Sequence, residues 1–187
     1  DGYSTKELVD MCKEVQSKYG IGWWGRHSVK VFEHLKNPTG DMNAVVVTPT
    51  TDWNGASNST YKDLELLIDN GYRLNVVEAQ TEDDIYRRLE AAPDQSINLL
   101  LIHAHGSEGE MAISQRWPFE KGKITNDYDD YSEWLAFSDK MAPNGRIILQ
   151  SCSTGKGGSE NTQNMISFFS DVFHDTPGLK ISAPNSP

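Results

Sequence analysis

The sequence predicts an α/β fold in which helices cover both faces of a mostly parallel central sheet. Two short apolar runs, residues 97–102 and 146–149, stop abruptly in small and polar residues. Buried parallel strands have this pattern where they end at the edge of a sheet. Other short apolar runs alternate with helical patterns of about ten residues, as in strand–helix–strand units with right-handed crossovers.

The individual elements follow one another regularly from residue 43. We expect strands at 44–47, 72–77 and 179–181, and within the stretches 97–106 and 146–155. Helical spacing of apolar residues predicts helices at 61–70, 81–92, 129–141 and 161–173. In the first of these helices, the residues expected to point inward are Leu64, Leu66, Leu67 and Ile68. Residues 106–113 are expected to form a small hairpin, and residues 114–128 a loop.

The first 40 residues are expected to form a helical extension in front of a domain that spans 41–187. A capping box, Ser4 with Glu7, opens a predicted helix over 4–18. Cys12 falls on the apolar stripe of that helix, so we interpret it as a packed core or interface thiol.

Composition restricts the class of protein. A chain of 187 residues with 37% apolar and 24% charged residues fits one soluble globular domain. The formal net charge of −10 argues against nucleic acid as a partner. No apolar run is long enough to cross a membrane, and no signal peptide is visible at the start.

Two cysteines, Cys12 and Cys152, are too few for a disulfide scaffold, and their spacing is not that of a metal site. Free thiols favour a reducing compartment, so we favour the cytoplasm. Secretion stays open, although the glycosylation sequon at Asn58 is too short a pattern to argue for it.

The two polar strand ends carry residues suited to thiol chemistry. Ligands and reacting groups gather outside the C-terminal ends of strands in open α/β sheets. Cys152 is the candidate nucleophile and His105 the candidate acid/base. The backbone amides of Gly106 and Cys152 are candidate oxyanion donors. His103 is interpreted as a buried or supporting histidine, on the same side as His105 if the strand continues.

This pattern resembles the caspase-like superfamily (clan CD) of cysteine peptidases, which includes caspases, legumain, clostripain, gingipain and separase. The segment His105-Gly106-Ser107-Glu108-Gly109 is similar to the His-Gly-x-x-Gly around the family's histidine. Gln150-Ser151-Cys152 is similar to the Gln-Ala-Cys of caspases. The chain departs from the caspase signature after the cysteine, where glycine appears only at Gly155. The likeness covers about residues 43–183 and is to the superfamily rather than to one member.

The resemblance implies a three-layer sandwich and a cysteine endopeptidase that acts on protein or peptide substrates through a thioester acyl-enzyme. This chemistry needs no metal or organic cofactor. The glycine-rich stretch from Ser153 to Ser159 is interpreted as a mobile loop beside the active site, and Lys156 in it is a candidate site for self-processing. The family core has one strand more than we count. That strand is expected in residues 20–40, beyond Pro187 or on a second chain, so further domains of the same precursor are expected partners.

Three residues are candidates for binding the substrate: Asp52, Gln150 and Ser151. Asp52 follows the first strand, where the family often has a residue of the specificity pocket, although Asp-Trp-Asn-Gly is also an ordinary turn sequence. Gln150 resembles the pocket glutamine of caspases, but the loop after the first strand lacks an arginine. The preference at the cleaved position stays open, with a basic residue favoured by Asp52 and the net charge.

Two alternative functions belong to other classes of protein. A caspase-like module that binds proteins without catalysis is the main alternative, although such a module has no chemical need for both His105 and Cys152. A flavodoxin-like nucleotide binder is the weaker one, because the loop after the first strand lacks a phosphate cradle. The Gly-Lys-Gly-Gly sequence at 155–158 does not fit a phosphate-binding loop either, since no Ser or Thr follows Lys156.

Overall fold

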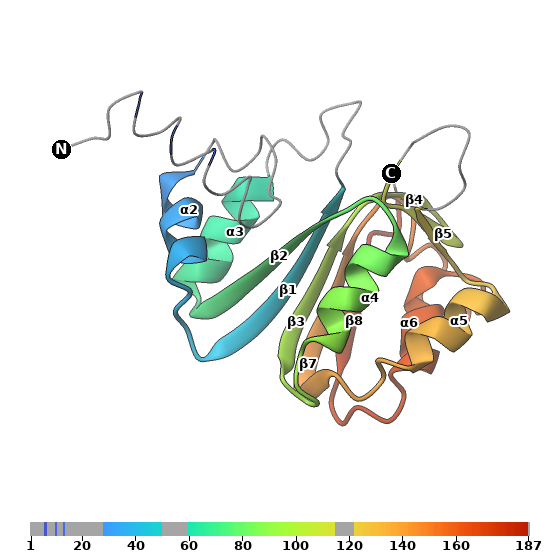
Figure 1. Cartoon of the computed structure of the whole chain (residues 1–187). Helices are drawn as coiled ribbons and strands as arrows, with labels where there is room; N and C mark the ends of the chain where they lie inside the picture. Colours follow the sequence, from blue (N-terminus) through green and yellow to red (C-terminus); the bar gives the residue numbers. More distant parts are fainter. Residues whose placement is uncertain are drawn as a thin grey trace.

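A computed structural model of the chain describes Lys6, Asp10, Lys13 and residues 28–49, 60–114 and 122–186. Within these ranges the predicted α/β class is confirmed, with a central sheet between two layers of helices (Figure 1). The helix expected over 4–18 and the candidates Cys12, Asp52 and Asn58 lie outside the described residues, apart from the helical Lys6, Asp10 and Lys13.

The central sheet has five strands, all parallel, in the order β2-β1-β3-β7-β8. Their bounds are β1 Met42–Pro49, β2 Tyr72–Ala79, β3 Ile97–His103, β7 Met141–Gln150 and β8 Lys180–Ser182. β1, β3 and β7 lie at the centre and are the near-continuous apolar runs of the sequence, as expected of strands covered on both faces. All five expected strands are therefore present.

The helices form the two outer layers. α2 (Val29–Lys36) and α3 (Thr60–Asp69) cover one face, and α4 (Glu82–Glu90), α5 (Tyr128–Leu135) and α6 (Met165–Val172) cover the other (Figure 1). Each layer has its own apolar core. The core under α2 and α3 contains Val31, Phe32, Leu35, Leu64, Val46 and Leu101. The other contains Ile85, Leu89, Trp134, Phe169, Val47 and Ile102.

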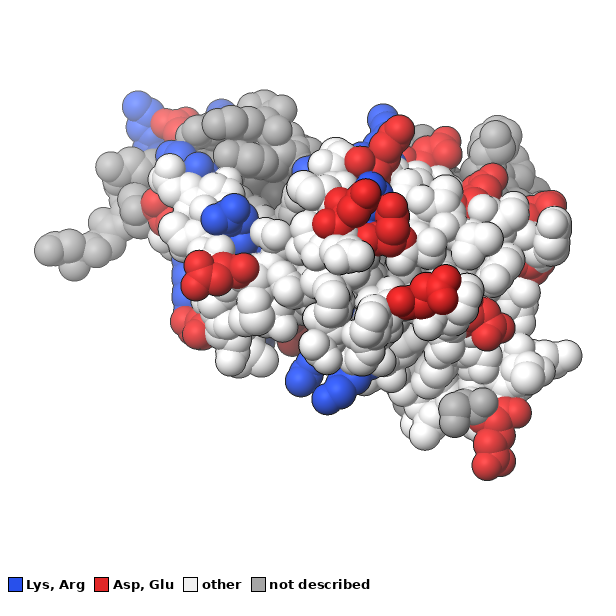
Figure 2. Space-filling model, turned by 90° about the horizontal axis from the view of Figure 1, so that it is seen from below, with Lys and Arg blue, Asp and Glu red and all other residues white. Residues whose placement is uncertain are grey.

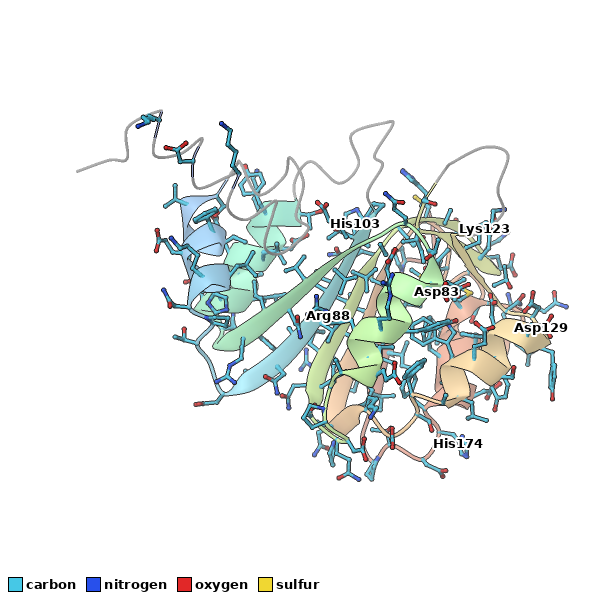
Figure 3. The ribbon with its side chains drawn as sticks, in the orientation of Figure 1. Asp83, Arg88, His103, Lys123, Asp129 and His174 are labelled. Atoms are coloured by element: carbon cyan, nitrogen blue, oxygen red, sulfur yellow. The ribbon has the colours of Figure 1, made fainter. Side chains whose placement is uncertain are left out.

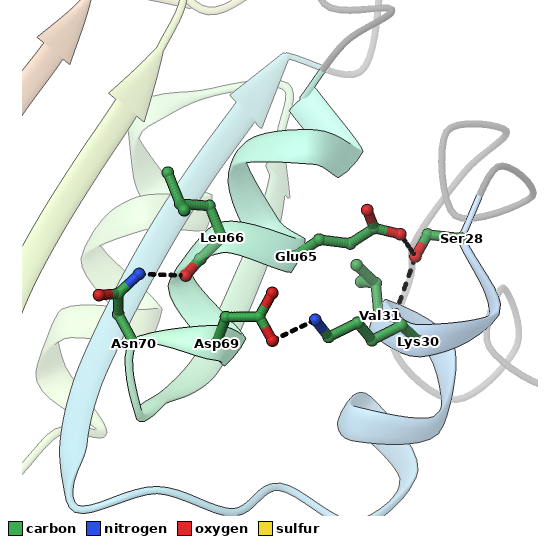
Figure 4. A network of polar contacts seen from close by, with 7 residues as sticks. All are labelled: Ser28, Lys30, Val31, Glu65, Leu66, Asp69 and Asn70. Carbon is green, nitrogen blue, oxygen red and sulfur yellow. Dashed lines mark hydrogen bonds and ion pairs between the residues drawn. The ribbon is translucent and has the colours of Figure 1, made fainter.

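Helix α2 belongs to the same core as the strands, although it precedes residue 41. Ser28 caps it by accepting a hydrogen bond from Val31 N (3.2 Å) and donates one to Glu65 of α3 (2.5 Å) (Figure 4). Lys30 pairs with Asp69 further along α3. These contacts join α2 to the first crossover helix of the sheet.

Some expected helix positions and boundaries are wrong. Leu66 was expected inside, but it points outward from α3 and is 61% exposed. α5 ends at Leu135 instead of continuing to residue 141, and Met141 begins β7. The apolar spacing continues past the end of α5 because Phe137 and Met141 pack on the core from a turn and a strand. α6 begins at Met165, four residues later than expected, where Asn164 caps it.

A second sheet, of three strands, begins at the C-terminal edge of the main sheet, directly after β3. The expected hairpin is confirmed as β4 (His105–Ser107) paired antiparallel with β5 (Glu110–Ala112). The region expected to be a loop contains β6 (Lys123–Thr125), which pairs with β5. Only three residues long, β6 gives no recognisable alternation in the sequence.

Acidic side chains are spread over the face of the molecule opposite the C-terminal strand ends, and basic ones form smaller separate groups there (Figure 2). None of the helices in the described ranges is long and apolar enough to span a bilayer.

Candidate active site

Cys152 lies in a tight turn directly after β7, at the C-terminal edge of the parallel sheet. Its side chain is exposed and its thiol is free. The next residue, Ser153, has a φ of 58°, in the left-handed region that residues other than glycine rarely adopt. The chain therefore turns sharply just after the thiol, and turns of this kind at strand ends expose a side chain at the edge of the sheet.

A pocket of about 410 Å³ opens beside Cys152. Its walls come from two segments that are far apart in the sequence: Gly106, Ser107 and Glu108 on one side, and Cys152, Ser153 and Lys156 on the other. Residues 106–108, which directly follow His105, and the cysteine loop thus share one cavity, and His105 itself is not among its lining residues. The two residues whose amides are candidate oxyanion donors, Gly106 and Cys152, both line it.

His105 does not continue the histidine strand. β3 ends at His103, and His105 is the first residue of β4 in the small sheet. A hydrogen bond from Ala104 N to Gln150 O (3.3 Å) joins the two segments just before they diverge, so His105 and Ser151 follow directly on either side of it. The His105 ring is partly buried, with its Nε2 atom inside.

Gly106 is required by the contact between these segments. A Cβ atom at this position would lie 2.1 Å from Ser151 Oγ and 2.8 Å from Glu110 O. Any larger residue would separate β4 from the cysteine loop, because contacts this short do not occur between real atoms. The glycine after His105 therefore allows the histidine segment to pack directly against the residue before Cys152.

Ser151, a candidate for binding the substrate, packs directly against Gly106. It is 4% exposed, and its Oγ makes no hydrogen bond to any described residue. Thr154, fully buried, donates a hydrogen bond from Oγ1 to Ser151 O (2.8 Å) and closes the turn. The small side chain of Ser151 fits under Gly106 and does not face solvent.

A set of polar contacts fixes the loop after Cys152 to the β4–β5 turn. Met165 N donates to Glu108 O (3.2 Å) and to Thr154 O (3.1 Å). The Glu108 carboxylate accepts a hydrogen bond from Asn161 and pairs with Lys156 (3.6 Å). Asn164, fully buried, donates to Lys156 O (3.1 Å) and accepts from Ser167 N (2.9 Å). We call this set the loop clamp.

Residues after β8 hold the same loop from its other side. Gly155 N donates to Pro184 O (2.8 Å), and Ser153 N to Ser186 O (3.4 Å). A Cβ atom on Gly155 would lie 2.9 Å from Ala183 O. This close approach explains why a glycine stands at 155, where the sequence departs from the caspase signature.

A different polar group lies on the α2–α3 side of the same edge. His103 is at the upper edge of the sheet in Figure 3, with its Nδ1 3.3 Å from Thr60 Oγ1 at the start of α3. Gln150 Nε2 donates to Asp63 Oδ2 (3.4 Å), also on α3. His103 therefore has a supporting contact, as expected, and lies on the face that α3 covers.

The larger hollow in the described structure, about 510 Å³, is elsewhere. It is lined mostly by carboxylates of α4, α5 and the small sheet, Glu82, Asp83, Glu110, Asp127, Asp130 and Glu133. Burial, helped by the negative charge of Asp130, raises the pKa of Glu82 to about 7. This hollow shares no lining residue with the pocket at Cys152.

No group of three or more His, Cys, Asp or Glu side chains within the described ranges is arranged to hold a metal ion. The residues that line the pocket supply a thiol, backbone amides and one Glu–Lys pair, and His105 directly precedes the lining residue Gly106. They are suited to nucleophilic and acid–base chemistry.

Several residues of this region were not identified from the sequence. Asp63, Glu108, Asn161 and Asn164 act through partners that are distant along the chain: Asp63 and Gln150 are 87 positions apart. Asn164 had one usable signal, since an Asn directly before an apolar helical run is typical of an N-cap. No protein-family model matches the chain, and no curated protein is significantly similar to it.

Proposed function

We propose that this chain is a cysteine endopeptidase that hydrolyses peptide bonds with Cys152 as nucleophile and His105 as acid/base. The observation that carries the proposal is the packing of Gly106 on Ser151 beside a shared pocket. Through it, a His-Gly segment and a Ser-Cys segment meet where substrates bind in open α/β sheets. The resemblance of both segments to the caspase-like superfamily supports the same reaction.

In the first half of the reaction, the Cys152 thiolate attacks the carbonyl carbon of the scissile bond, and the carbonyl electron pair moves onto oxygen. The amides of Gly106 and Cys152 stabilise this oxyanion by donating hydrogen bonds. The C–N bond then breaks, the His105 imidazolium gives its proton to the leaving amine, and a thioester remains on Cys152. In the second half, His105 takes a proton from water, whose oxygen attacks the thioester. The thiolate leaves and the acid product is released.

The loop clamp serves this reaction by holding the thiol at a constant place relative to β4. Glu108 and Lys156 both line the pocket, and the pair between them bridges its two walls. A catalytic pair placed on two segments needs such a connection, because an error of about 1 Å in its geometry costs on the order of 100-fold in rate.

The test is active-site labelling combined with cleavage of a positional-scanning peptide library. Peptidyl acyloxymethyl ketones should label the peptide that contains Cys152 and leave Cys12 unlabelled. Cys152→Ala and His105→Ala should lower the cleavage rate by at least about 1,000-fold with an unchanged melting temperature. Thr162→Ala, a change at an exposed position of the same loop away from the pocket, is the matched control and should keep most of the activity.

Full activity of Cys152→Ala would overturn the proposal. The absence of both labelling and cleavage, over every residue type at the cleaved position, would favour the non-catalytic binding module instead.

A further inference from the structure

A row of polar side chains crosses the sheet at its C-terminal edge, on the face covered by α3. Thr48 pairs with Glu78 of β2, and His103 pairs with Gln150 of β7. Val47 pairs with Ile102, which puts Thr48 beside His103. The four side chains share one face because the residues two positions earlier, Val76, Val46, Leu101 and Ile148, all pack in the α2–α3 core. We call Glu78, Thr48, His103 and Gln150 the edge row.

The edge row lies where the order in which strands are added to the sheet reverses. From β1 the chain adds β2 on one side, and from β3 it adds β7 and β8 on the other. Thr48 ends β1 and His103 ends β3. This change of direction is the switch point at which open α/β sheets bind their ligands.

Two buried hydrogen-bond acceptors that receive no donor from the described residues lie at this place. Gln150 Oε1 and Thr48 Oγ1 are both buried, and no described residue is hydrogen-bonded to either atom. Thr48 is only 1% exposed. Beside them, Asp63 supplies a carboxylate that accepts one hydrogen bond from Gln150 Nε2. Buried acceptors without partners cost free energy, so their presence indicates a ligand that brings donors.

The charge of the edge row and its neighbours on α3 favours a donor group that is positively charged. Neither the edge row nor its α3 neighbours, Thr60 and Asp63, include a Lys or Arg. Asp63 stands in the first turn of α3, where the helix dipole interacts favourably with an acidic side chain. A guanidinium or ammonium group offers several N–H donors and the opposite charge, whereas an acidic side chain would be repelled.

Gln150 links this group to the thiol. It stands two residues before Cys152, so at most about 7 Å of chain separates the two Cα atoms. Because the side chains of Lys and Arg are long, a basic residue whose carbonyl lies at the Cys152 sulfur can extend toward Gln150, which is hydrogen-bonded to Asp63. We therefore propose that Asp63, together with Gln150 and Thr48, selects substrates with a basic residue on the acyl side of the cleaved bond.

This inference rests on the proposed peptidase function and assigns specificity to Asp63, a residue of α3. The expected role of Asp52 concerns a residue outside the described ranges and is independent of it. His103 has a positioning role here, since its contact with Thr60 holds the start of α3 over the edge row.

The experiment compares two substrates that differ only in charge, a peptide with arginine at the cleaved position and the same peptide with citrulline. Wild type should favour arginine by about 100-fold or more in kcat/KM. Asp63→Asn should bring this ratio to within a few-fold of one while still cleaving the citrulline peptide. Asp69→Asn removes a carboxylate from the other end of α3 and should keep the wild-type ratio. A ratio within one enzyme does not depend on the folded fraction.

The results separate the two proposals. Cleavage after acidic or aromatic residues, or an Asp63→Asn enzyme with the wild-type ratio, overturns the specificity inference and leaves the peptidase intact. If wild type neither cleaves the library nor reacts with any acyloxymethyl ketone at Cys152, the peptidase proposal fails, and the inference that depends on it fails too.

Discussion

At Gly106 the absence of a side chain allows the contact between the two segments that line the pocket. Its missing Cβ leaves room for Ser151 Oγ, and its backbone lines the pocket beside Cys152. A methyl group added at residue 106 would therefore disturb both the packing against Ser151 and the wall of the pocket.

We predict that Gly106→Ala is destabilised by about 2–3 kcal/mol, because the new Cβ meets a backbone carbonyl that cannot move away. Labelling of Cys152 should slow at least about tenfold as β4 shifts from the cysteine loop. Chemical denaturation and labelling rates measure the two effects. Gly109→Ala is the control. Its Cβ would meet only the Asn126 side chain, at 3.2 Å, so an equal loss there would contradict the explanation.

The residues themselves could be predicted from the sequence only where their chemistry is local. Cys152, His105 and Gly106 stand next to apolar strands, and that pattern points to them. Asp63 has no such signal, since a carboxylate in the first turn of a helix is common and its partner Gln150 is remote. The separation of His105 from β3 also has a tertiary cause: the antiparallel pairing of β4 with β5 ends the parallel strand at His103.

At the level of elements, the loop between β7 and α6 is held by hydrogen bonds from the buried Asn164. Asn164 is both the cap of α6 and the internal support of the loop, through hydrogen bonds to Lys156 O and Gly158 O (2.6 Å). Since it is fully buried, removing its amide leaves Ser167 N without this acceptor. Lys156 O and Gly158 O each lose one hydrogen bond and keep one from Asn161.

We predict that Asn164→Ala lowers the free energy of unfolding by about 2–4 kcal/mol, well above the ~1 kcal/mol of an ordinary cap. Cleavage at Lys156 by trypsin should become faster in the folded protein, because Lys156 O loses a hydrogen bond from Asn164. Asp127→Ala removes the exposed cap of α5 and should show the smaller loss without faster nicking. Equal rates of nicking in the two variants would count against the role of the loop clamp.

Elements with long apolar runs were predictable, and short or interrupted ones were not. β1 and β3 and their crossovers follow from pattern alone, whereas β6 has three residues and depends on pairing with β5. The start of β7 was missed for a similar reason. Its register against β3 shifts after Met141, and a left-handed Asn144 (φ 60°) interrupts the strand, so the sequence there resembles a turn.

For the molecule as a whole, stability should depend on a carboxyl group far from the thiol. Glu82 accepts hydrogen bonds from Tyr86 (3.0 Å) and Trp134 Nε1 (3.4 Å), and so connects α4 to α5. Burial and the nearby Asp130 raise its pKa to about 7, from an ordinary value of 4.5. The folded protein therefore retains a proton that the unfolded chain releases.

A raised pKa of a carboxyl group means that its contribution is complete below about pH 4.5 and is lost as pH rises to about 7. We predict that the free energy of unfolding falls between pH 5 and pH 8 by on the order of 1 kcal/mol more in wild type than in Glu82→Gln, after allowance for solvent screening. Glutamine keeps an oxygen acceptor for both donors and carries no charge. Denaturation curves at several pH values measure the difference. Asp83→Asn, an exposed neighbour on α4, should follow wild type, and a parallel fall in Glu82→Gln would exclude Glu82 as the cause.

The bonds between the cysteine loop and residues 184 and 186 also constrain when the site can exist during synthesis. Parallel strands β3 and β7 are both translated before β8, yet Gly155 N and Ser153 N obtain their partners only from the segment that follows β8. A ribosome-bound chain that has not yet released this segment carries the thiol on a loop secured at one side only. The cysteine loop therefore obtains all of these hydrogen bonds only after residues 184–186 have left the exit tunnel.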